Sequence, residues 1–248
     1  MIPIYLSTGC YNKKEKTIED MILRAASASH KIQGVELSFL DPCELEYFNY
    51  SDKTDNALKK MKCTLHMPTK NIIYENNEEC KKLIDKAIDV YDHFKCEVAV
   101  FHYQNVESFD YLISRFGKRK MLIENKDQIS AKDCIAEMKP LFESYPDLGM
   151  VIDFEHAKYG AQQIIKEFEE KICEVHWSSP KISINHNSYN TILRSFDNNI
   201  AFARRLNKPV VIEIDLRSED ELENEYLEIS EFVIRKEIGL LDYHLNRY

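Results

Sequence analysis

Short apolar segments alternate along this chain with longer segments whose apolar residues recur at helical spacing. Each short segment is bounded by polar residues, which is typical of a buried strand, and the longer segments are typical of amphipathic helices. We predict strands at residues 2–7, 34–39, 63–67, 97–102, 120–125, 149–154, 171–177 and 208–216. We predict helices at residues 17–30, in the segment before Lys62, and at 78–94, 108–116, 131–145, 160–169, 189–206 and 219–238, with the tail to Tyr248 packed back on the surface.

This alternation predicts the fold class. Strands that alternate with helices form parallel sheets with right-handed crossovers. Eight such units in 248 residues predict an α/β protein, a (β/α)8 TIM barrel that forms a single domain over residues 1–248. The alternative is an open doubly wound sheet, which usually carries a Gly-rich turn after its first strand. The chain lacks a GxGxxG sequence, so we favour the barrel.

Composition narrows the class of protein. No apolar run approaches the roughly 18 residues of a membrane span, and the N-terminal residues do not resemble a signal peptide. The seven cysteines are odd in number and form no CxxC pair, which favours reduced thiols and a cytoplasmic location. The formal net charge of −9 disfavours non-specific binding of nucleic acid, which depends on Lys and Arg.

Polar side chains gather at the ends of the predicted strands. The active site of a TIM barrel lies at the C-terminal ends of its strands. Strand periodicity places Glu124 on the same face as Leu122, and Asp153 on the same face as Val151, so both carboxylates continue an inward-pointing row. The residues at or just after strand ends are Glu36, His66, His102, Glu124, Asp153, His156, His176, His186 and Glu213.

A single buried histidine is usually a hydrogen-bonded core residue. Many unpaired polar groups on one rim are different, because each would lose several kcal/mol of solvation, by rough estimate. A bound divalent metal removes that cost, and imidazole with carboxylate suits zinc, manganese, iron or cobalt. The sequence therefore predicts a metal site at this rim.

Six short motifs connect the chain to a known superfamily. TLHMP, VAVFH, LIEN, VIDFEHA, EVHWS and VIEI follow one another on the third to eighth strands. In this order the chain resembles the xylose isomerase-like TIM barrels, the superfamily of endonuclease IV and of many sugar isomerases and epimerases.

The resemblance implies ligands for the metal. As in the sugar isomerases, one divalent ion would be held by Glu124, Asp153, His176 and Glu213. In the endonuclease IV branch, His66 and His102 would join Glu124 at a second metal, and His156 and His186 would serve a third. That branch carries an Asp two residues before the last His, where this chain has Ile184, and the departure speaks against a third metal.

Three functions follow from this resemblance. We rank first a divalent-metal-dependent isomerase or epimerase of a small-molecule sugar or sugar phosphate, in which Glu124 and Glu213 move a proton next to a carbonyl. Zinc or manganese is the favoured metal, with magnesium, cobalt or iron as alternatives. Glu36, Lys126 and Trp177 are the candidates for sugar contacts. The last helix, with Tyr226 and Phe232, would allow a homodimer.

The alternative is a zinc phosphodiesterase similar to endonuclease IV that acts on abasic DNA. His66 and His102 favour it, whereas the net charge and Ile184 oppose it. The third function is a catalytically inactive binding barrel, which the complete four-ligand set opposes. Fold class alone does not decide among the three.

Overall fold

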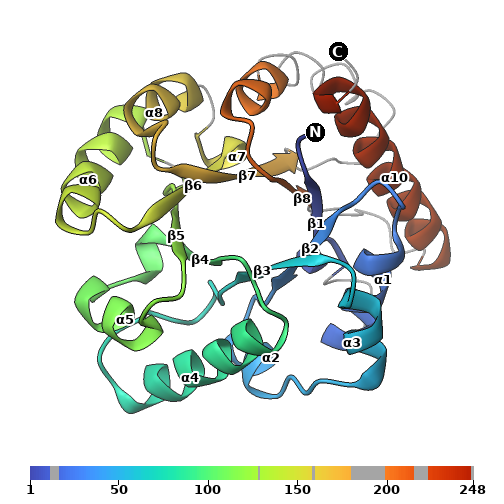
Figure 1. Cartoon of the computed structure of the whole chain (residues 1–248), viewed down its shortest axis with the longest axis horizontal. Coiled ribbons are helices and arrows are strands. Elements are labelled where there is room, and N and C mark those ends of the chain that lie inside the picture. The colour runs from blue at the N-terminus through green and yellow to red at the C-terminus, as the bar shows by residue number, and fades with distance from the viewer. Residues whose placement is uncertain (12–16, 128, 158–159, 180–198, 215–222, 247–248) are drawn as a thin grey trace.

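The computed structural model describes residues 1–11, 17–127, 129–157, 160–179, 199–214 and 223–246. Eight parallel strands form a closed barrel in which each strand pairs with its neighbours in chain order and β8 pairs with β1. Figure 1 shows the helices as an outer ring around these strands. The predicted (β/α)8 architecture is confirmed.

The strands begin and end close to their predicted positions. They are β1 (Ile4–Ser7), β2 (Gly34–Ser38), β3 (Lys62–His66), β4 (Ala99–His102), β5 (Met121–Glu124), β6 (Gly149–Asp153), β7 (Ile172–Ser179) and β8 (Val210–Ile214). Only β3 and β7 extend outside the predicted segments, β3 by Lys62 and β7 by Ser178 and Ser179.

The helices include two short ones where one was predicted before Lys62. They are α1 (Ile18–Ser27), α2 (Pro42–Glu46), α3 (Asp52–Leu58), α4 (Glu78–His93), α5 (Phe109–Phe116), α6 (Ala131–Ser144), α7 (Phe154–Ala157), α8 (Ala161–Phe168) and α10 (Glu223–Asn246), with residues 199–206 also helical. Among the described helices, none is long and apolar enough to cross a membrane.

The end of the last helix corrects the sequence prediction. We expected a helix to Ile238 and a surface tail, but α10 continues to Asn246. Ile234, Ile238, Leu241 and Leu245 are all buried, and their spacing keeps them on one helix face beyond Ile238. The side chains of Tyr226 and Phe232, on which a homodimer would depend, lie outside the part of the chain whose side chains are described.

The barrel interior has an apolar side and a polar side. Val98, which directly precedes β4, forms an apolar cluster with Val100, Leu122 and Val151 of β4, β5 and β6, separate from the larger core between strands and helices. Across the barrel, the buried side chains of β2, β3 and β7 include the polar residues Glu36, Thr64, Glu174 and His176. The polar side therefore leads from inside the barrel to the strand ends.

Candidate functional site

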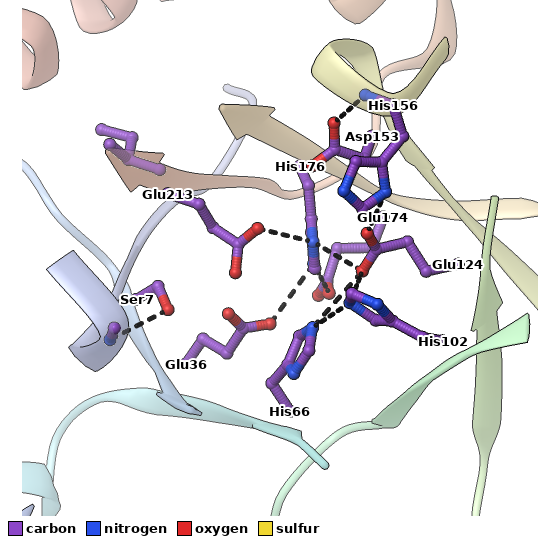
Figure 2. Close-up of polar contacts among 12 residues, drawn as sticks. Ser7, Glu36, His66, His102, Glu124, Asp153, His156, Glu174, His176 and Glu213 are labelled. Atoms are coloured by element: carbon purple, nitrogen blue, oxygen red, sulfur yellow. Dashed lines mark hydrogen bonds and ion pairs between the residues drawn. The ribbon is translucent and has the colours of Figure 1, made fainter. Parts of the chain in front are cut away.

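Strands β2 to β8 and the short helix α7 bring the predicted site residues together inside the barrel and at the C-terminal ends of its strands, as Figure 2 shows. Glu36 lies on β2, and β3 and β4 end in His66 and His102. The cluster is completed by Glu124, Asp153, His156, His176 and Glu213, from β5, β6, α7, β7 and β8. Of the histidines predicted for the site, His186 lies outside the described residues.

Glu124 lies at the centre of the histidines. Its Oε2 atom is 3.3 Å from Nε2 of His66, 3.2 Å from Nε2 of His102 and 3.2 Å from Nδ1 of His176. Its Oε1 atom is 2.8 Å from Nδ1 of His156. The carboxylate is 1% exposed, so four imidazoles take the place of water around it.

His176 lies between two carboxylates of the four-residue set. Its Nδ1 atom is 3.2 Å from Glu124 and 3.1 Å from Oε2 of Glu213. A metal could take one ligand atom from each of Asp153, His176 and Glu213, because these three atoms lie within 4.8 Å of one another. Glu124 and Glu213 thus meet at one imidazole nitrogen, and Asp153 lies close to both His176 and Glu213.

Backbone carbonyls fix the orientation of two imidazoles. Nδ1 of His66 lies 3.1 Å from the carbonyl oxygen of Met67, and Nδ1 of His156 lies 3.1 Å from that of Asn125. A carbonyl only accepts, so the nitrogen that faces it carries the proton. In the neutral tautomer this leaves the Nε2 lone pair of each ring available for a metal.

Opposite charges balance inside the cluster. Burial raises the pKa of Glu124, but the charges of His102 and His176 lower it more and hold it well below its usual range. Burial lowers the pKa of His156, whereas Asp153 and Glu124 raise it to about 10. Burial likewise lowers the pKa of His66, but its hydrogen bond to Glu124 and the nearby carboxylates raise it to about 9. Burial raises the pKa of Asp153.

The donor set fits a divalent metal. Among the described residues, Glu124 Oε1 and His176 Nδ1 are buried atoms without a hydrogen bond. The nitrogen-to-oxygen distances of 3.1–3.3 Å match the separation, about 3.3 Å, of ligands that share one zinc at roughly 2.0–2.1 Å. Side chains of Glu213 and His102 are 23% and 16% exposed, so the site opens to solvent beside them.

Two buried polar residues near the site, Glu174 and Asn125, were not predicted as site residues from the sequence. Glu174 lies inside the barrel beneath His176, and its Oε1 atom is 3.3 Å from Nε2 of that ring. Because Glu174 precedes His176 by two residues on one strand, the periodicity that identified Glu124 would also have identified it. Asn125 joins two strand ends, since its amide donates to the carbonyl of Asp153 and accepts from the Asp153 N–H.

The three predicted sugar contacts have different surroundings. Glu36 is fully buried beside His176. Lys126 is partly exposed and pairs with Glu137 of α6 at 3.2 Å. Trp177 requires a correction, because its neighbour His176 points into the barrel and its own indole points outward. The indole donates to Glu237 of α10 at 2.8 Å and packs edge-on against Phe154. We therefore remove Trp177 from the candidates for substrate contact.

Comparison with known proteins shows the fold. No family model matches the chain, and no curated protein matches it in sequence. Similar solved structures include D-allulose 3-epimerase from Methylomonas sp., with a TM-score of 0.63, 14% identity and 98% of both chains covered.

Two further structures are similar. The probable 3-DHS dehydratase AsbF from Bacillus anthracis has a TM-score of 0.62 and 11% identity over 94% of this chain and 98% of that one. The 3-keto-D-glucoside 4-epimerase YcjR from E. coli has a TM-score of 0.55 and 14% identity over 94% and 100%. The chain thus shares the TIM-barrel fold of these three structures and of a structure that carries a xylose isomerase-like TIM barrel.

Proposed function

We propose that this protein is a divalent-metal-dependent isomerase or epimerase of a small-molecule sugar or sugar phosphate, which moves a proton on the carbon next to a carbonyl. The observation that carries the proposal is the position of His176 Nδ1 between the carboxylates of Glu124 and Glu213, with Asp153 beside them. The similar solved epimerases support the same reaction class.

Glu124, Asp153, His176 and Glu213 would hold the metal, with zinc or manganese favoured. A bound divalent cation supplies Lewis-acid polarisation of a carbonyl and a neighbouring hydroxyl. The buried position of Glu124, Asp153 and His176 excludes bulk water from these side chains and strengthens their electrostatic interactions.

Glu124 and Glu213 differ in their surroundings, which suits a division of proton transfer. Glu213 is the more exposed of the two and is the carboxylate that an entering substrate can reach first. Glu124 is buried, and its histidine neighbours hold its pKa well below its usual range, so it is a carboxylate able to accept a proton. We assign the movement of the proton on and off the carbon next to the carbonyl to Glu124 and Glu213, on opposite sides of the site: the carboxylate that removes the proton becomes protonated, and the exposed Glu213 exchanges its proton with solvent. Glu36 and Lys126 remain the candidates for contacts to sugar hydroxyl or phosphate groups.

The test combines metal content with solvent proton exchange. Protein purified without chelator is analysed for metals, and small ketoses are incubated with it in deuterated water. We expect one divalent ion per chain and deuterium at the carbon next to the carbonyl. Glu124→Gln and Glu213→Gln should each lower the exchange rate by at least about 100-fold, the usual size of an acid–base contribution.

A matched control is Glu237→Gln, which makes the same change at a buried carboxylate of α10, outside the site. It should leave both metal content and exchange unchanged. Full exchange activity in Glu124→Gln would overturn the assignment of the site.

A second candidate function is a zinc phosphodiesterase acting on abasic DNA. The specific observation in its favour is the 3.2 Å distance between Nε2 of His66 and Nε2 of His102, both beside Glu124. Two imidazole nitrogens that face one carboxylate suit a second metal. Two or three zinc ions per chain, together with cleavage of an abasic-site duplex, would establish this function in place of the isomerase.

A further inference from the structure

Two carboxylates inside the barrel face the inner nitrogen of His176. Nε2 of His176 is 3.3 Å from Oε1 of Glu174 and 3.3 Å from Oε2 of Glu36. All three side chains are at most 2% exposed. Figure 2 shows these groups on the side of the imidazole away from the contact between Nδ1 and Glu213.

The contact with Glu174 has hydrogen-bond geometry, and the contact with Glu36 does not. A carboxylate only accepts hydrogen bonds, so the Nε2–H of His176 donates a hydrogen bond to Glu174. When the neutral ring carries its proton on Nε2, the lone pair lies on Nδ1. That is the nitrogen that faces Glu124 and Glu213.

We propose that Glu174 is a positioning residue that accepts the Nε2–H of His176 and thereby makes Nδ1 the metal-binding nitrogen. This inference rests on the metal site of the proposed function. Glu174 lies beneath the ring and acts on the metal only through it. Partners of this kind hold the orientation and tautomer of metal-binding histidines, and their loss typically lowers metal affinity by roughly 10–100-fold.

The strand geometry explains why Glu174 suits this role better than Glu36. Glu174 and His176 are two residues apart on β7, so their side chains leave the strand on the same face and their separation is fixed by one backbone segment. Glu36 reaches the ring from β2, across the barrel. Both its carboxylate oxygens lack a hydrogen-bond partner among the described residues.

The experiment measures zinc affinity by competition with a chromogenic chelator. We expect Glu174→Leu to weaken zinc binding by roughly 10–100-fold, with the number of ions per chain unchanged at saturation. Glu174→Gln should recover part of that loss, because its amide oxygen still accepts the Nε2–H. The matched control, Glu237→Gln, should bind zinc as the wild type does.

A second readout reports the tautomer directly. In zinc-loaded protein labelled with ¹⁵N-histidine, the His176 signal, assigned by its absence in His176→Gln, should show zinc on Nδ1 and a proton on Nε2. Zinc on Nε2 in the wild type would overturn the proposal, and this result does not require Glu174→Leu to fold. Wild-type affinity in Glu174→Leu would also overturn it.

The loss of one whole ion from Glu174→Leu at saturating zinc would make Glu174 a ligand and not a positioning residue, which likewise overturns the proposal. None of these measurements depends on turnover. If the affinities change as expected while no ketose exchanges its proton, the reaction proposed above fails and the role of Glu174 stands.

Discussion

At the scale of single residues, Glu237 offers a test of stability that is separate from the site. Burial raises the pKa of Glu237, although the hydrogen bond from Trp177 partly lowers it. A carboxyl whose pKa is higher in the folded state stabilises the fold below its unfolded pKa, and this contribution is lost as pH rises through the folded pKa. Glu237→Gln keeps the hydrogen-bond acceptor and cannot ionise.

We therefore expect Glu237→Gln to match the wild type in free energy of unfolding near pH 4 and to exceed it at pH 8. Urea unfolding at both values measures the difference. A gain of equal size at both pH values would contradict the prediction, because it would not come from ionisation.

One local rule was enough to predict from the sequence where several residues lie, while their roles stay predictions. A polar residue at the end of an apolar run identified Glu124, Asp153 and Glu213, since strand ends meet at one rim in any parallel barrel. Trp177 was named as a candidate sugar contact without this rule, and strand periodicity turns its indole outward because its neighbour His176 occupies the inward face. The hydrogen bond between Glu174 and His176 required ring orientations, which no sequence pattern contains.

At the scale of elements, two glycines should respond in opposite ways to the same substitution. A Cβ at Gly34, at the start of β2, would lie 2.7 Å from the carbonyl oxygen of Lys62 on the paired strand. A Cβ at Gly239, within α10, would meet nothing within 4 Å. Gly34→Ala should therefore lower the free energy of unfolding by about 1–3 kcal/mol. Gly239→Ala should raise it by about 0.5–1 kcal/mol.

Chemical unfolding of both variants beside the wild type measures these changes. Because each variant adds one methyl group, each serves as the control for the other. A stable Gly34→Ala protein would mean that β2 and β3 separate at this point more easily than their backbone pairing indicates.

Element boundaries show where sequence patterns were insufficient. The amphipathic repeat of α4 is long and regular, and the sequence placed its start at Glu78 correctly. The segment before Lys62 has no such repeat, and its two helices depend on capping by Asp41 and Ser51. The extension of α10 beyond Ile238 depends on the packing of Leu241 and Leu245, which is a tertiary contact.

At the scale of the whole molecule, the eight local units were sufficient to predict the barrel, because each strand and helix pair follows its own pattern. The division of the interior was not predictable in the same way. Its apolar side comes from β4, β5 and β6 and its polar side from β2, β3 and β7. Each strand contributes one or two side chains, so the division exists only after the barrel has closed.

This division predicts that metal binding stabilises the entire fold. The buried cluster joins strands from both sides of the barrel, and the unfolded chain cannot assemble it. A ligand that binds only the folded state at 100 times its Kd adds about 2.7 kcal/mol of stability. For a chain of this size that corresponds to a rise in Tm of roughly 5–11 °C, at about 2–4 °C per kcal/mol.

Thermal unfolding of chelator-treated protein, titrated with zinc or manganese, measures the rise. Asp153→Asn is the matched variant, since it keeps the size of a buried ligand and removes its charge. The Tm of this variant should rise only at much higher metal concentrations than the Tm of the wild type. An equal rise in wild type and Asp153→Asn would place the ion elsewhere on the chain. A Tm that does not depend on either metal would remove the metal site, and with it the reason for five carboxylates and four imidazoles to share one end of the barrel.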